Sequence, residues 1–227
     1  MSTKKLARVA IVVAQVILLL GAAYATDNQG QEITVRVIDE VGVPAKEWEA
    51  AKLFADKILR SAGVPVTWVR CLWNPATGNT DCPLSEIPNQ LSLLVVSEQT
   101  ARRLRDHAEA FGMALVLPNG SFGSRGYVFY GRIQIKCAEK HEINEESLLG
   151  AVVAHEIGHL LLGPNSHSRV GIMKPEFDRN DVRGIMLSAL KFDHRQSEAL
   201  RVAVTSRVQA SRSQQANPLY ISEASMR

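Results

Sequence analysis

The chain has 227 residues, of which 46% are hydrophobic and 22% are charged, as in an ordinary globular protein, and this length suggests one domain or at most two. The formal net charge is +3, but residues 1–25 carry three cations and no acid, so residues 26–227 are neutral, with 23 Lys plus Arg against 23 Asp plus Glu. A neutral chain without a basic block argues against nucleic acid or an anionic membrane as a partner.

Residues 1–25 have the pattern of a secretory signal peptide. Three cations are followed by an apolar run over residues 9–20 and then by Ala23-Tyr24-Ala25. We therefore expect cleavage after Ala25 and a mature protein that is secreted or periplasmic. The alternative is an uncleaved anchor, but a spanning helix needs about 20 apolar residues, so we expect no stable membrane insertion after signal removal.

The first half of the mature chain predicts strands around one long helix. Residues 32–38 alternate as a strand does, and residues 44–62 have helical spacing that ends at Gly63. Residues 64–69 alternate again, and residues 91–96 form the continuous apolar run of a buried strand.

Three cysteines follow the predicted signal. Cys71 and Cys82 flank a turn-rich stretch, and an oxidising compartment would allow a disulfide that closes this loop. That bridge would be worth on the order of 2 to 3 kcal/mol, and it would leave Cys137 over. Two other pairings, or three reduced and buried thiols, remain open.

The second half predicts a short helix over residues 100–109, a strand over 113–117, a flexible loop over 119–126 and a strand over 127–135. A long helix is expected over residues 144–162, and another begins near Asp193. Met186 lies in a short helix and is assigned to the core, and residues 209–227 read as a flexible polar tail. The expected fold is α+β: a mixed sheet with a long backing helix, a motif-bearing helix and a C-terminal helix, all in a single domain over residues 26–208.

The predicted helix over residues 144–162 carries the sequence HEIGH, from His155 to His159. Residues at i and i+4 share one helix face, so the two imidazoles can bind one metal ion, and Glu156 can reach a water on that ion. A chance pattern of surface polar groups is the alternative. It is disfavoured because HEIGH interrupts an otherwise apolar helix, where unsatisfied polar groups are costly.

Gly163 and Pro164 then turn the chain, and His167 follows before the segment GIMKP, residues 171–175. At this point the chain resembles the metzincins, most closely their matrixin-like branch, with the pattern HExxHxxGxxH and a later methionine turn. It also resembles uncharacterised exported bacterial proteins with HEIGHLLLG and a later His-Ser. The resemblance implies a zincin fold in which Zn²⁺ is held by His155, His159 and His167. It also implies that Glu156 is the general base and that Met173 forms the floor beneath the metal. Gly163 and Pro175 would lie in the turns that shape the site.

The spacing departs from the family pattern. Gly163 and His167 come four and eight residues after His159, where the family has three and six, so Leu162 stands at the family's glycine position. A turn through Gly163-Pro164-Asn165 can absorb the difference. The rival third ligands are His107, His141, His194 and Glu198.

The resemblance therefore implies an exported zinc endopeptidase that binds peptide or protein substrates extended along a sheet edge, with the strand over residues 113–117 as the expected edge. The alternative is a zincin-fold protein that binds zinc as a scaffold, with weak turnover or none. A zinc hydrolase acting on a non-peptide amide is a third possibility.

Overall fold

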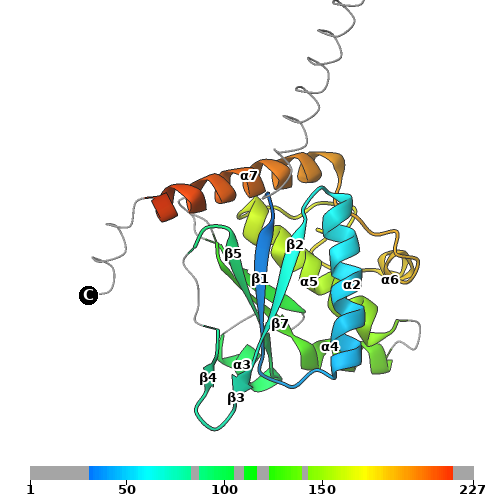
Figure 1. The fold of residues 1–227 in the computed structure, drawn as a ribbon. Coiled ribbons are helices and arrows are strands. Elements are labelled where there is room, and N and C mark those ends of the chain that lie inside the picture. The colour runs from blue at the N-terminus through cyan, green and yellow to red at the C-terminus, as the bar shows by residue number, and fades with distance from the viewer. Residues whose placement is uncertain (1–30, 83–86, 105–109, 117–122, 140–142, 217–227) are drawn as a thin grey trace, which may run out of the picture. The chain divides into compact units, whose positions relative to one another are not determined.

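The computed structural model describes residues 31–82, 87–104, 110–116, 123–139 and 143–216. The elements of the fold belong to one compact unit, Glu32–Arg227 (Figure 1). The predicted signal peptide, residues 119–122 of the predicted loop and the last eleven residues of the predicted tail lie outside the described residues.

A five-stranded sheet forms the centre of this unit, in the order β2-β1-β5-β7-β6. Its strands are β1 (Ile33–Asp39), β2 (Val66–Cys71), β5 (Gln90–Val96), β6 (Gly112–Leu115) and β7 (Arg125–Phe129). Four strands are parallel to their neighbours, and β6 pairs antiparallel to β7 at one edge. A separate two-stranded ribbon joins β3 (Trp73–Asn74) to β4 (Asn79–Thr80).

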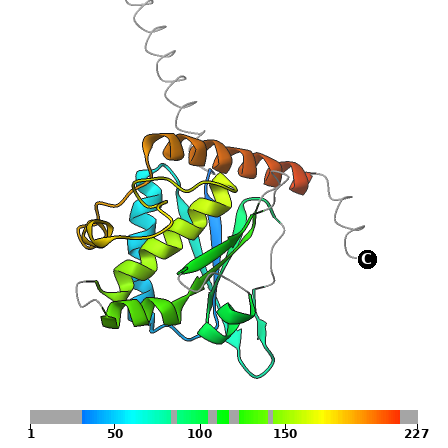
Figure 2. The same ribbon diagram turned by 180° about the vertical axis from the view of Figure 1, so that it is seen from behind.

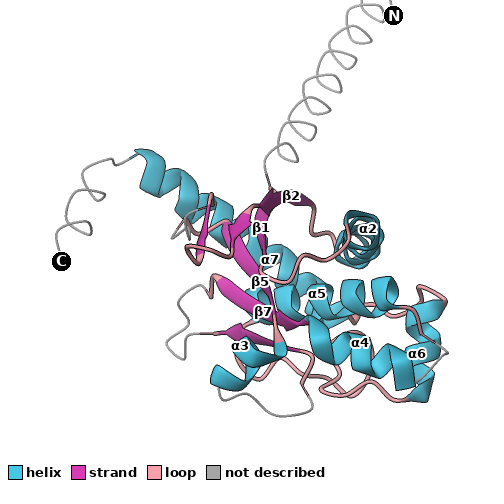
Figure 3. Cartoon of the chain, turned by 90° about the horizontal axis from the view of Figure 1, so that it is seen from below, coloured by secondary structure: helices cyan, strands magenta, loops and turns pink. Residues whose placement is uncertain are grey.

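Helices α2 (Ala45–Ser61) and α5 (Glu145–Leu162) pack against each other on one face of the sheet, as the view along the strands shows (Figure 3). Their contact is close because Gly150 has no side chain: a Cβ there would lie 2.5 Å from the Ala51 carbonyl oxygen. The motif helix α5 is thereby packed against both α2 and the sheet.

Side chains alternate between the two faces of the central strands. In β5, Leu91, Leu93 and Val95 enter the main core beneath α2 and α5. Val96 joins a smaller cluster with Ala101 of α3 (Glu98–Arg103). The sheet is therefore covered on both faces near its centre, as parallel strands require.

The remaining helices follow β7 and the motif helix: α4 (Tyr130–Glu139), α6 (Arg179–Met186) and α7 (His194–Ala216). Helix α7 runs across one end of the sheet, which is visible from both sides (Figures 1 and 2). The mixed sheet, the backing helix α2, the motif helix α5 and the C-terminal helix α7 confirm the predicted fold class.

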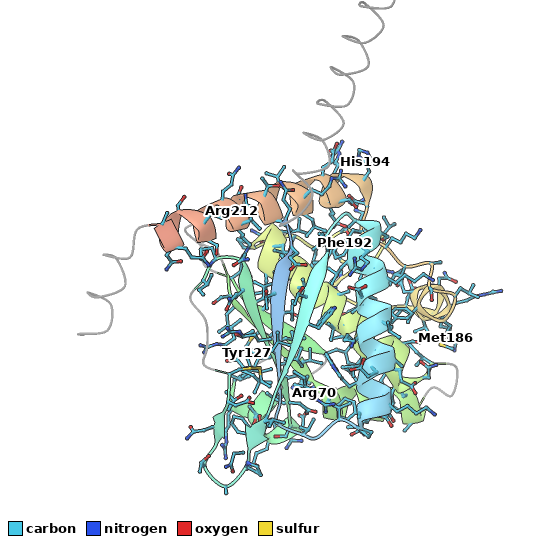
Figure 4. All side chains as sticks on the ribbon, in the orientation of Figure 1. Arg70, Tyr127, Met186, Phe192, His194 and Arg212 are labelled. Carbon is cyan, nitrogen blue, oxygen red and sulfur yellow. A yellow bond between two sulfur atoms is a disulfide. The ribbon has the colours of Figure 1, made fainter. Side chains whose placement is uncertain are left out.

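Three local predictions were wrong. Residues 127–135 are not one strand, because β7 ends at Phe129 and helix α4 begins at Tyr130. The polar tail does not begin at residue 209, because α7 continues to Ala216 with Ser211 buried. Met186 is 42% exposed at the end of α6 instead of being part of the core (Figure 4).

The predicted disulfide is present between Cys71 at the end of β2 and Cys82, and it closes the loop that holds the β3–β4 ribbon. Cys137 is a free, buried thiol on α4. Among the helices in the described part of the chain, none combines the length and the apolar character needed to cross a membrane.

Candidate metal centre

The helix that carries the motif is capped at both ends by its own sequence. At the N-terminus the Asn144 side chain accepts a hydrogen bond from the Ser147 amide, and Glu145 and Glu146 lie in the positive first turn. At the C-terminus Gly163 takes a φ of 85°, a conformation that favours glycine, and the chain leaves the helix there. The metal-ligand candidates His155 and His159 therefore sit on a rigid helix that ends just after them.

The structure brings the three predicted histidines together. The Nε2 atom of His159 lies 2.9 Å from Nε2 of His155 and 3.0 Å from Nε2 of His167. The three side chains form a group of potential metal ligands within 4.8 Å of one another. The turn after Gly163 thus absorbs the late position of His167.

The other ring nitrogen of two of these histidines is held by a partner. Nδ1 of His155 lies 2.7 Å from the Ile172 carbonyl oxygen, which can only accept, so Nδ1 carries the proton. Nδ1 of His159 lies 2.8 Å from the Ser166 hydroxyl. These contacts orient both rings so that their Nε2 atoms face each other.

Burial favours the neutral form of the histidines. It lowers the pKa of His155 to about 4, a shift that the hydrogen bond to Ile172 partly opposes. Burial, and then the neighbouring His155 and His167, lower the pKa of His159 to about 3. Burial also lowers the pKa of His167. Neutral imidazoles are the form that a metal ion requires.

These residues fit a zinc ion. Lone pairs on neutral imidazoles repel one another at about 3 Å unless a cation or proton lies between them. Two nitrogens bound tetrahedrally to zinc at about 2.0–2.1 Å lie roughly 3.3 Å apart, close to the spacing of these Nε2 atoms. Within the described residues the group contains three ligands and no fourth His, Cys, Asp or Glu. The described residues thus leave a fourth tetrahedral position without a protein ligand, which is the arrangement of catalytic zinc sites.

Glu156 follows the first histidine and is buried, with 4% of its surface exposed, and it lines a cleft that the histidines also line. Its carboxylate packs against Gly112 of the edge strand β6, where a Cβ would lie 2.5 Å from Oε1. The absence of a side chain at Gly112 thus provides the space for this carboxylate. Gly112 was not identified from the sequence, and a glycine directly before the strand predicted over residues 113–117 was its only signal.

The methionine predicted to lie beneath the metal, Met173, is fully buried. It packs under the motif helix at Gly158, where a Cβ would lie 2.6 Å from the Met173 sulfur and 2.8 Å from the Phe192 ring. Gly171, with a φ of 80°, precedes it and lets the chain pass close to the Lys191 carbonyl. The glycine inside HEIGH therefore has a packing role that sequence analysis missed.

A cleft with a volume of about 390 Å³ opens beside the histidines. Pro175, the last residue of GIMKP, lies in its wall, and Phe177 in the same wall also contacts the His155 ring edge to face. The lining is otherwise mostly apolar, with Phe111, Met113, Ala114, Val116, Val152 and Pro164. Such a cavity accepts an apolar group beside the metal ligands.

The two rival ligands that the structure describes, His194 and Glu198, do not join this group. The His194 side chain is 85% exposed at the start of α7, where it lies 3.8 Å from Glu198 (Figure 4). His107 and His141 lie outside the described residues. Among the described residues, His167 is the imidazole that completes the cluster.

No protein-family model and no curated protein sequence matches this chain. Two solved structures are similar to it in fold. The archaemetzincin of Methanopyrus kandleri aligns over 78% of this chain and 98% of its own, with 16% identity and a TM-score of 0.46. A zinc-dependent peptidase from Methanocorpusculum labreanum aligns over 73% of this chain and 99% of its own, with 15% identity and a TM-score of 0.42.

Proposed function

We propose that this protein is a zinc-dependent peptidase whose ligands are His155, His159 and His167 and whose general base is Glu156. The observation that carries the proposal is the convergence of three Nε2 atoms beside a buried carboxylate, at the wall of an open cleft. A structural zinc site would be closed by a fourth protein ligand. The three-ligand group therefore favours catalysis over the scaffold alternative.

A zinc ion held there would supply Lewis acidity toward the scissile carbonyl and the attacking water. The Glu156 carboxylate accepts a proton as the water oxygen bonds to the carbonyl carbon. It then returns that proton to the amide nitrogen as the carbon–nitrogen bond breaks, so that an acid and an amine leave. Gly112 beside Oε1 keeps this carboxylate at the cleft wall.

The peptide would lie along β6, because this strand pairs with β7 on one side only and is the edge of the sheet next to the cleft. An extended substrate would add a strand to that edge by backbone hydrogen bonds. The apolar lining, with Phe111 and Phe177, supports a preference for an apolar side chain beside the scissile bond.

We also propose that the protein acts outside the cytoplasm, after removal of residues 1–25. The signal-like N-terminus supports export, and so does the Cys71–Cys82 disulfide, since such bonds persist in oxidising compartments. Mass determination of the N-terminus of the protein recovered from its host would test cleavage after Ala25.

The test of function compares the wild type with Glu156→Gln. Each purified protein is assayed for bound zinc by elemental analysis and for cleavage of a peptide library. We expect one zinc in both and cleavage in the wild type alone, because the amide cannot accept the proton. His194→Ala is the control, since this exposed histidine lies outside the cluster. A wild type that binds zinc and cleaves no peptide would favour the scaffold alternative.

A further inference from the structure

The loop between the second and third ligands, residues 163–167, contains more than the turn that returns His167 to the site. Its Ser166 hydroxyl lies 2.8 Å from Nδ1 of His159. When Nε2 binds a metal, Nδ1 carries the proton, and the Nδ1–H group donates a hydrogen bond to the Ser166 oxygen. The ring of the second ligand is then fixed by the residue that precedes the third ligand.

The backbone of Ser166 is held in turn by the C-terminal helix. Nε2 of Gln196 donates to the Ser166 carbonyl oxygen at 3.3 Å, and the Gln196 side chain is buried at the start of α7. The orientation of this amide is determined by its other bond, because its Oε1 accepts from the Asp193 amide at 3.1 Å. The oxygen faces the helix cap, so the nitrogen must face Ser166.

We infer that Ser166 and Gln196 are positioning residues for the metal centre, acting through His159, an inference that rests on the proposed zinc site. Ser166 selects the His159 tautomer that exposes Nε2, and Gln196 fixes the loop that carries both Ser166 and His167. The interval of eight residues from His159 to His167 thus delivers a third ligand and also a hydrogen-bond partner for the second.

The neighbouring serine provides a matched control. Ser166 and Ser168 flank His167, and each hydroxyl makes one short hydrogen bond to a residue nearby in the sequence. The Ser168 hydroxyl donates its hydrogen bond to the Val170 carbonyl oxygen at 2.7 Å, and not to a histidine ring. Removing either hydroxyl disturbs the same loop, but only the change at Ser166 removes a partner of His159.

The experiment measures the zinc dissociation constant by competition with a chromogenic chelator, and the visible spectrum of the Co²⁺ form, for the purified chain and four variants. We expect Ser166→Ala to weaken zinc binding about 10- to 100-fold and to change the Co²⁺ spectrum. Ser166→Thr should restore most of the affinity, since it keeps the hydroxyl. Ser168→Ala should bind zinc as the wild type does.

Gln196→Glu keeps an acceptor for the Asp193 amide and removes the donor to Ser166, so zinc binding should weaken without loss of the helix cap. Circular dichroism and urea unfolding of the metal-free proteins establish that each variant is folded. Wild-type zinc affinity in both Ser166→Ala and Gln196→Glu would overturn this inference alone. A wild type that binds no zinc would overturn the proposed function and this inference with it.

Discussion

Gly158 of the motif helix lies directly against Met173, so that a Cβ at residue 158 would come within 2.6 Å of the methionine sulfur. The Phe192 ring closes the same space at 2.8 Å, and both side chains are buried. The helix can therefore approach the methionine turn only because this position has no side chain.

Gly158→Ala should destabilise the protein, although alanine is the better helix former by about 1 kcal/mol. Overpacking of a buried contact costs about 1–3 kcal/mol, which exceeds that gain. Urea unfolding would measure the change. Gly184→Ala in α6 is the control, because its Cβ would meet only the Leu190 side chain at 3.5 Å, and it should be neutral or stabilising. Equal stabilities for the two variants would contradict the packing role of Gly158.

A second glycine prediction concerns catalysis. In Gly112→Ala the new methyl group would meet Oε1 of Glu156 at 2.5 Å and the Tyr127 carbonyl oxygen at 2.7 Å, so the carboxylate or the edge strand must move. We expect kcat to fall by at least about 100-fold, the range in which a misplaced catalytic group acts, with zinc still bound. Peptide cleavage and zinc content would be measured together. Gly131→Ala, whose nearest contact would be 3.7 Å, should cleave normally.

Arg207 is a fully buried cation that joins α7 to the end of the motif helix. It donates to the carbonyl oxygens of Leu160, Gly123 and Pro88 at 2.6, 2.7 and 2.8 Å. Burial lowers the pKa of Arg207 to about 10, so the guanidinium remains charged at pH 7. The Leu160 carbonyl lies in the last turn of α5, where the helix dipole favours a cation.

Arg207→Met should therefore destabilise the fold by on the order of 3 kcal/mol, since three buried carbonyls would lose their donor. Thermal and urea unfolding would measure the loss. Arg212→Met on the same helix is the matched control, because Arg212 is exposed and should be replaceable at little cost (Figure 4). A similar small change in both variants would show that the buried guanidinium is not needed for stability.

The thiol of Cys137 should be unreactive in the folded protein. Burial, and then the charges of Glu145 and Glu146, raise its pKa from 9.0 to about 11. At pH 8 the thiolate fraction is therefore about 100-fold smaller than that of a thiol with a pKa of 9.0. Alkylation by iodoacetamide should be slow at pH 8, speed up as the pH rises toward 11, and become fast in urea. Mass spectrometry would follow the reaction, and rapid labelling of the folded protein at pH 8 would contradict this prediction.

Apolar residues predicted the parts of the fold that are buried most completely. The helix 144–162 and the strand 91–96 were recognised because their buried residues are nearly all apolar. The same logic misplaced the end of α7, because its buried face includes Arg207 and Ser211, whose polarity hid the helical repeat. It also misread residues 130–135, where period-two alternation concealed the helical spacing of Tyr130, Ile133 and Cys137.

The candidate site was predictable where its residues are the candidate metal ligands and the carboxylate beside them. His155, Glu156, His159 and His167 come from one short segment with recognisable chemistry. The supporting residues were not predictable, because each acts through a contact made across the fold. Gly112 meets Glu156 from the edge strand β6, and Gln196 reaches Ser166 from the last helix. Neither residue type indicates such a contact by itself.

The three ligands occupy a stretch of 13 residues, from 155 to 167. Closing so short a loop costs little entropy, so an unfolded chain can also bring these imidazoles to one zinc ion. Zinc should therefore stabilise the native state by less than its affinity suggests, since binding to the unfolded chain offsets part of the gain. Preference for the folded chain would come from two contacts of the native structure, the Ile172 carbonyl with His155 and Gln196 of the C-terminal helix with the Ser166 backbone.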